Sequence, residues 1–145
     1  MKTFTDTEGR TWNIDIHVTA VKRVRSLTGV NIASMSGEGI IALANDPEKL
    51  CDVIFALVKP QADEKNITDE DFGRAMRGDP IEHATNAFLE ELVNFTPSPA
   101  GRKILGLALD QSKDLHETAM AKLAEHLEKG TAKQALTEKL DNILK

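Results

Sequence analysis

The sequence has very little cysteine and few aromatic residues. Its single cysteine, Cys51, excludes an internal disulfide and a metal site built from several cysteines, and it favours a reducing compartment. The 145 residues include five Phe, one Trp and no Tyr, so Leu, Ile, Val and Ala must fill any core. The hydrophobic share of 41% is enough for such a core, and its aliphatic character favours helices packed on helices over a β-sandwich.

Long apolar segments are also missing. No run of 18 apolar residues occurs, so the sequence predicts no transmembrane helix and no membrane partner. The first ten residues lack the apolar stretch that a secretory signal peptide requires. We therefore expect a cytoplasmic protein.

The sequence has fewer basic than acidic residues, 18 Lys and Arg against 23 Asp and Glu, and about half of the acidic residues lie in the middle of the chain. The net charge is −5 with a pI near 5.4, which argues against a nucleic-acid partner because phosphate binding needs a basic surface. Residues 46–95 contain twelve Asp and Glu against five Lys and Arg. Helix capping and solvation explain this acidic block most simply, and electrostatic steering of a basic partner is compatible with them.

The N-terminal 15 residues predict a β-hairpin. Two segments that alternate apolar and polar residues, 2–5 and 11–15, flank a turn over residues 6–10 that contains Gly9. Phe4, Trp12 and Ile14 would share one face. Since an isolated hairpin is marginally stable in water, this face is expected to cover the helices that follow. Residues 30–32 could add a third short strand.

Helix-start signals recur through the rest of the chain. Asp46-Pro47, Thr68 and Asp79-Pro80 each precede apolar residues at helical spacing. Pro60 is expected to end or kink the helix that it follows, with residues 61–66 forming a brief continuation or a loop. The predicted helices cover residues 20–28 with Thr19 as N-cap, 40–44, 46–59, 68–77, 79–95 and 99–129, and a final short helix begins at Thr131.

The clearest break in the chain is Thr96-Pro97-Ser98-Pro99, because two prolines at i and i+2 enforce an extended joint. It predicts a division into residues 3–96, a β-hairpin plus helical domain, and residues 97–145, a C-terminal helical arm. The expected fold class is thus mainly α. A hairpin of two strands, or three if residues 30–32 join it, packs on a helical bundle that is followed by one long and one short helix.

Catalytic and metal-binding patterns are absent from the sequence. The four histidines, His17, His83, His116 and His126, share no metal-ligand spacing. Cys51 follows Leu50 on a strong helix without a Cys-His signature, which favours a small buried apolar role over a nucleophile. No two catalytic-type residues have a spacing that fixes their mutual geometry. We therefore predict no enzyme activity, no cofactor and no metal.

The most informative interaction feature is the apolar pattern near the C-terminus. His116, Met120, Leu123 and Leu127 have the 4-3-4 spacing of a short heptad-like seam. Packing of this seam on the core and docking to a partner or a second copy remain open alternatives. The candidate partner contacts are Leu115, Met120, Leu123 and Leu127, with a second set of Leu136, Leu140 and Ile143.

Residues 4–32, 46–61 and 67–97 are similar in layout to small phage and prophage proteins of the tail-assembly chaperone type. The similarity includes the helix start Ile67-Thr68-Asp69-Glu70-Asp71-Phe72 and the stop Phe95-Thr96-Pro97. This resemblance implies a non-enzymatic protein of the host cytoplasm that binds a helical client, such as a tape-measure or other tail protein, during virion assembly. The alternative is a structural virion subunit, in the tail or the head–tail connector, that self-associates through its C-terminal helices.

Overall fold

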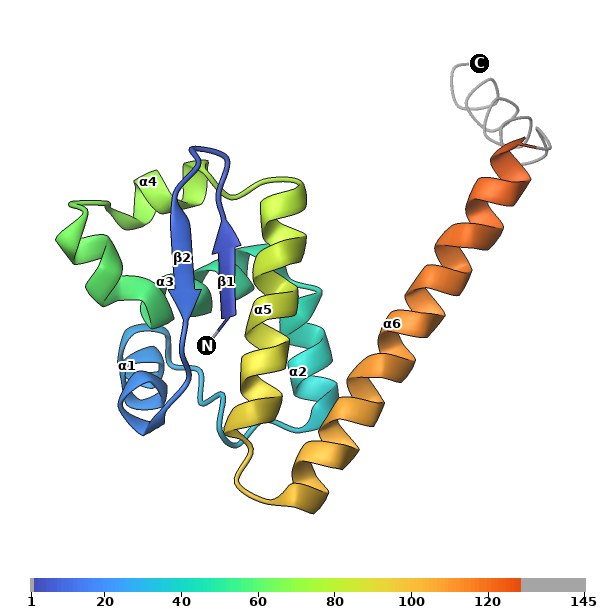
Figure 1. Ribbon diagram of the computed structural model, residues 1–145, viewed down its shortest axis with the longest axis horizontal. Coiled ribbons are helices and arrows are strands. Elements are labelled where there is room, and N and C mark those ends of the chain that lie inside the picture. Colours follow the sequence, from blue (N-terminus) through green and yellow to red (C-terminus); the bar gives the residue numbers. More distant parts are fainter. Residues whose placement is uncertain (1, 129–145) are drawn as a thin grey trace, which may run out of the picture. The chain divides into compact units, whose positions relative to one another are not determined.

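The computed structural model describes residues 2–128 (Figure 1). Its contacts divide the chain into two compact units, residues 1–109 and 110–145, and each unit is described by itself. The predicted final helix from Thr131 lies outside the described residues, as do Leu136, Leu140 and Ile143. The predicted division into residues 3–96 and 97–145 stays a prediction.

The described part of the chain is mainly helical and begins with an antiparallel hairpin, so the predicted fold class is confirmed. Its elements, in chain order, are β1 (Lys2–Thr5), β2 (Thr11–Ile14), α1 (Val18–Thr28), α2 (Gly37–Ala44), α3 (Pro47–Glu64), α4 (Asp69–Arg74), α5 (Asp79–Phe95) and α6 (Pro99–Glu128).

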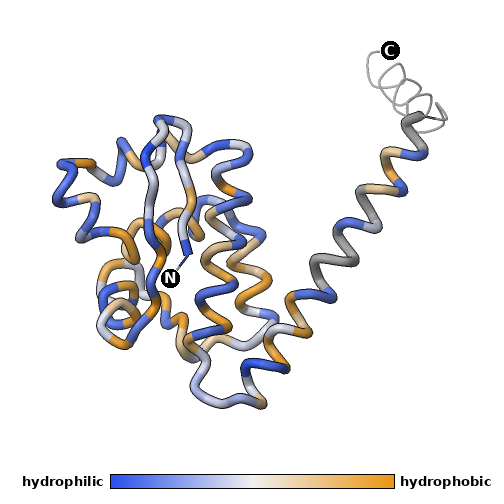
Figure 2. Tube along the Cα trace, viewed as in Figure 1, coloured by the Kyte–Doolittle hydropathy of each residue, from blue (hydrophilic) through white to orange (hydrophobic). Residues whose placement is uncertain are grey.

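The hairpin buries one face, as its alternating pattern predicts. Lys2 pairs with Ile14 and Phe4 with Trp12 in the β1–β2 register, and Phe4, Trp12 and Ile14 are all buried. In Figure 1 α5 runs beside β1, and contacts link β2 to α3 and α1 to α3. The hydrophobic core therefore lies between the hairpin and the helices. Figure 2 shows apolar residues recurring along α2, α3 and α5.

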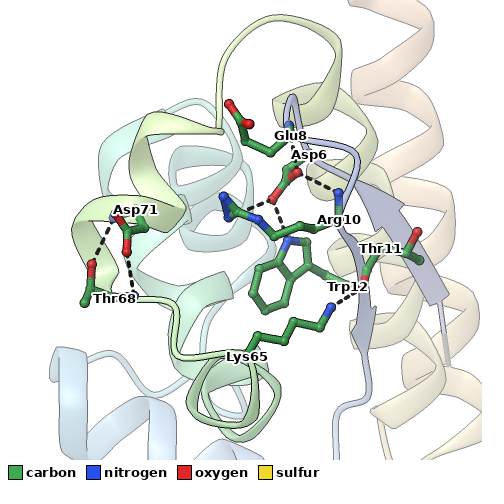
Figure 3. Close-up of polar contacts among 8 residues, drawn as sticks. All are labelled: Asp6, Glu8, Arg10, Thr11, Trp12, Lys65, Thr68 and Asp71. Carbon is green, nitrogen blue, oxygen red and sulfur yellow. Dashed lines mark hydrogen bonds and ion pairs between the residues drawn. The ribbon is translucent and has the colours of Figure 1, made fainter.

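A buried carboxylate fixes the hairpin turn. Asp6 Oδ1 accepts hydrogen bonds from the backbone N–H groups of Glu8 and Arg10, each at 3.0 Å. Asp6 Oδ2 accepts one from Trp12 Nε1 at 2.9 Å and lies 3.6 Å from Arg10 Nη1 (Figure 3). The Trp12 ring then meets Phe72 edge-on at 5.3 Å between centroids. The polar turn and the apolar core are thus joined through one indole.

Helix α3 continues past Pro60 to Glu64. Of the two predicted alternatives for residues 61–66, a brief continuation of the helix or a loop, the continuation is therefore the one observed. Proline cannot donate to the carbonyl four residues earlier, which here is that of Ala56. Arg23 of α1 supplies the missing donor, because its Nη1 lies 3.2 Å from Ala56 O and 3.0 Å from Leu57 O. Arg23 is half-buried and joins α1 to α3.

Two local expectations are wrong. Residues 30–32 form no strand, and the sheet within residues 2–128 has two strands. Turn chemistry at Asn31 prevails there, since its Oδ1 accepts from Ala33 N and its carbonyl accepts from Ser34 N. Helix α1 is capped by His17, whose Nδ1 accepts from Ala20 N at 3.1 Å, and Thr19 lies inside the helix.

The connection from α5 to α6 is a hydrogen-bonded corner. Thr96 Oγ1 donates to Leu92 O at 3.0 Å, and Arg102 Nη1 donates to Thr96 O at 2.9 Å. Ser98 Oγ accepts from Gly101 N at 2.8 Å, and a Cβ at Gly101 would lie 2.8 Å from that oxygen. A larger residue at this position would therefore displace the Ser98 hydroxyl from its capping position. None of the helices in residues 2–128 is both long and apolar enough to cross a membrane.

We expect Arg23→Met to lower the free energy of unfolding by about 2 kcal/mol, because two carbonyls of α3 lose a charged donor. Urea unfolding followed by circular dichroism measures this loss. Lys22→Met, at an exposed position of the same helix, is the matched control and should change little. In a Pro60→Ala background the new N–H can satisfy Ala56, so the cost of Arg23→Met should shrink by about 1 kcal/mol. Additive effects of the two substitutions would contradict this role.

We expect Asp6→Ala to cost about 3 kcal/mol, because three N–H groups lose their acceptor and the indole N–H is buried. Thermal and urea unfolding provide the measurement. Glu8→Ala is the control in the same turn, since its side chain is exposed and only its backbone N–H bonds Asp6. Equal stability of the two variants would show that the turn does not depend on the carboxylate.

Candidate functional site

The first unit carries an apolar groove at the α5–α6 corner. It has a volume of about 280 Å³ and is lined by residues from four segments. Leu92 and Phe95 end α5, Ile32 and Met35 come from the α1–α2 loop, and further lining residues are Ile40 of α2 and Ile104, Leu105 and Ala108 of α6. None of the lining residues carries an ionisable side chain. This groove can bind an apolar group and offers no acid–base chemistry.

The start of α6, which contributes Ile104 and Leu105 to the groove, also has aliphatic side chains exposed to solvent. Leu105 and Leu109 of α6 pack against the core, but Ile104 is 69% exposed and Leu107 is 55% exposed. Large aliphatic side chains are usually withdrawn from water. The start of α6 therefore fixes one apolar face on the body and leaves another uncovered in this chain.

The sequence-predicted contacts fall on α6 and beyond it. Leu115, Met120, Leu123 and Leu127 all belong to α6, in the second unit. Leu123 is 48% exposed, so at this position the alternative of docking to a partner is open. The second predicted set, Leu136, Leu140 and Ile143, lies outside the described residues.

Sequence reasoning missed the groove. None of the groove residues Ile104, Met35 and Phe95 is among the contacts that the sequence predicts. These residues come together because the corner at Thr96–Pro99 turns the chain back, which no periodicity reveals. The available signal was the Pro-Ser-Pro joint, which is followed within six residues by the aliphatic pair Ile104 and Leu105.

The candidate reactive residues are not brought together. His17 serves as a helix cap and His83 is exposed on α5. Cys51 is half-buried, and burial, followed by the charges of Asp52 and Asp69, raises the pKa of its thiol. A raised pKa keeps the thiol protonated, which is the opposite of what an activated nucleophile requires. Among the residues that the structure describes, no group of three His, Cys, Asp or Glu is placed to hold a metal ion.

The acidic residues at the starts of α3 and α4 have two kinds of surroundings. Thr68, the predicted helix start, forms a capping box with Asp71 at the start of α4 (Figure 3). The hydrogen bonds from the backbone and the hydroxyl of Thr68 hold the pKa of Asp71 below its usual range. Asp52 on α3 behaves differently: partial burial and the charges of Asp69, Glu48 and Asp46 raise its pKa. These four carboxylates, from the starts of α3 and α4, thus form one field of like charge.

Comparison with protein families, with curated proteins and with solved structures finds no match to this chain. The resemblance to tail-assembly chaperones therefore stays a prediction.

We expect Asp52→Asn to raise the free energy of unfolding at about pH 7 and to leave it unchanged near pH 3. The pKa of Asp52 is raised in the folded state, so the folded state binds more protons and its stability falls as pH rises through this window. The substitution removes that loss. Urea unfolding at the two pH values measures it, with Asp110→Asn, an exposed carboxylate of α6, as control. A gain of equal size at both pH values would contradict the electrostatic origin.

Proposed function

We propose that this protein is a non-enzymatic protein-binding module that holds a helical, apolar segment of a client protein, in the manner of a phage or prophage tail-assembly chaperone. The observation that carries this proposal is the apolar groove at the α5–α6 corner, with Ile104 exposed on its wall. A helix laid against such a surface would place side chains at i, i+3, i+4 and i+7 on it.

Two surfaces of the chain support the proposal, each by itself. In the first unit the groove has a volume suited to one or two large aliphatic or aromatic side chains, and its lining is apolar. In the second unit α6 carries the predicted seam, of which Leu123 is exposed. Burial of a Leu or Ile side chain against a partner contributes about 1.5–3 kcal/mol, so a few such contacts suffice for binding.

The chemistry of the described residues also favours binding over catalysis. The groove lining contains no ionisable group, and burial and neighbouring carboxylates disfavour the thiolate of Cys51. The acidic charge of the middle block would favour a client whose flanking residues are basic, since complementary charge speeds encounter. The resemblance of residues 3–97 to tail-assembly chaperones adds the class of client, a tape-measure or other tail protein.

Co-expression with the products of neighbouring genes tests the proposal. We expect a tagged chain to copurify with a helical tail protein and to keep it soluble. Leu123→Glu and Ile104→Glu should each weaken that complex by at least about tenfold, since each places a charge on an apolar contact. Ala124→Glu and Lys103→Glu, at neighbouring exposed positions, are the matched controls and should have little effect.

Sedimentation separates this function from its alternative, a structural virion subunit that self-associates through α6. The exposed aliphatic residues of α6 would serve a second copy as well as a client. Rings or tubes formed by the purified chain, and lost in Leu123→Glu, would favour the structural role. A chain that stays monomeric and binds none of the neighbouring products would contradict both.

A further inference from the structure

The outer edge of β2 is occupied by a side chain that imitates a strand. Gln61 Oε1 accepts a hydrogen bond from Asn13 N at 2.9 Å, and Gln61 Nε2 donates one to Asn13 O at 2.8 Å. Asn13 faces Thr3 in the register of the hairpin. Because both of its backbone groups bind Gln61, they point away from β1. The side-chain amide of Gln61 therefore provides hydrogen-bond partners for both the N–H and the carbonyl of Asn13.

Thr11, the next residue of β2 that faces the outer edge, is also bound by a side chain from the end of α3. Lys65, which follows α3 directly, donates from Nζ to Thr11 O at 3.2 Å and lies 4.7 Å from the centre of the Trp12 ring (Figure 3). Thr11 is two residues from Asn13, so it presents its backbone to the same edge. The carbonyls of both edge residues thus have donors from the end of α3.

The geometry at Asn13 matches that of strand pairing. In an antiparallel sheet, the two residues of a hydrogen-bonded pair exchange both N–H···O=C bonds. The amide of Gln61 makes this same exchange with Asn13. An added strand and the Gln61 side chain therefore compete for one position, and the strand can bind only when the side chain leaves.

We propose that the end of α3, through Gln61 and Lys65, closes the outer edge of β2 against strand addition by a second copy of this chain. We take a second copy as the occupant because the outer edge of β2 can pair with the same edge of another chain. Two β2 strands related by a two-fold axis through Asn13 would pair Asn13 with Asn13 in a reciprocal exchange, and Thr11 with Asp15 on either side. Exposed edges are ready templates for such pairing, and proteins cover them for this reason.

The variant Gln61→Met tests the proposal, since it keeps the length of the side chain and removes both hydrogen bonds. Hydrogen exchange of the Asn13 amide, measured by NMR, should become about tenfold faster or more at low protein concentration. Sedimentation over a concentration series should show self-association at least about tenfold tighter than that of the wild-type chain. Gln111→Met, at an exposed position of α6, is the control and should match the wild type in both measurements.

A double variant identifies the edge. Asn13→Pro removes the edge N–H, and proline is tolerated on strand edges, so Gln61→Met/Asn13→Pro should return to the wild-type level of association. If Gln61→Met fails to fold by circular dichroism, Lys65→Met replaces it, and a smaller rise in association, again abolished by Asn13→Pro, is expected. Unchanged association in the folded variant, or association that persists with Asn13→Pro, would overturn the proposal. Because the proposed client-binding surfaces are the α5–α6 groove and α6, loss of client binding leaves this test unaffected.

Discussion

The continuity of α3 through Pro60 is the constraint on which the first unit depends. A proline inside a helix removes a donor and strains the turn before it, at a cost of about 3 kcal/mol or more. The chain offsets part of that cost by directing Arg23 from α1 to the carbonyls of Ala56 and Leu57. The same contact joins α1 to α3. With the helix intact, its last turn reaches the hairpin, where Ala62 is buried and Gln61 binds β2.

The hairpin depends on α3 in turn. Two short strands bury too little apolar surface to be stable alone. Trp12 is fully buried, with Phe72 beside it and Lys65 over its ring, and its N–H is satisfied by Asp6. An indole needs a partner for its N–H when it is buried. Here the partner is Asp6, which also accepts the hydrogen bonds that shape the turn. The packing of Trp12 in the core and the geometry of the turn therefore depend on the same carboxylate.

The proposed function uses the apolar side chains at the start of α6 that the core does not cover. Leu105 and Leu109 of α6 pack against the core. The first turn of that helix is held at the corner by hydrogen bonds from Gly101 N to Ser98 Oγ and from Arg102 to Thr96 O. Ile104 and Leu107 of the same segment are exposed to solvent. An apolar surface that is already positioned by the fold loses less entropy when a partner docks.

Local chemistry was predictable from the sequence where one or two neighbouring residues decide it. Asp46-Pro47 starts α3, Thr68 and Asp71 form their capping box, Gly29 ends α1 with positive φ, and the alternation of Phe4, Trp12 and Ile14 gives the buried face of the hairpin. Caps, turns and periodicity act within a few residues, so the amino-acid order alone contains them. The failures were also local: Asn31 bends a segment whose apolar residues suggest a strand.

Only the tertiary structure decided the outcomes that need partners distant in the chain. Whether Pro60 ended a helix depended on Arg23, 37 residues earlier; whether β2 kept an open edge depended on Gln61. The groove needed four segments to meet at one corner. Hydrogen-bond partners and cavities of this kind are set by packing in three dimensions, where distance along the chain carries no information. The sequence by itself determined a mainly helical protein that begins with a β-hairpin, and the fold determined which of its apolar side chains are left exposed to solvent.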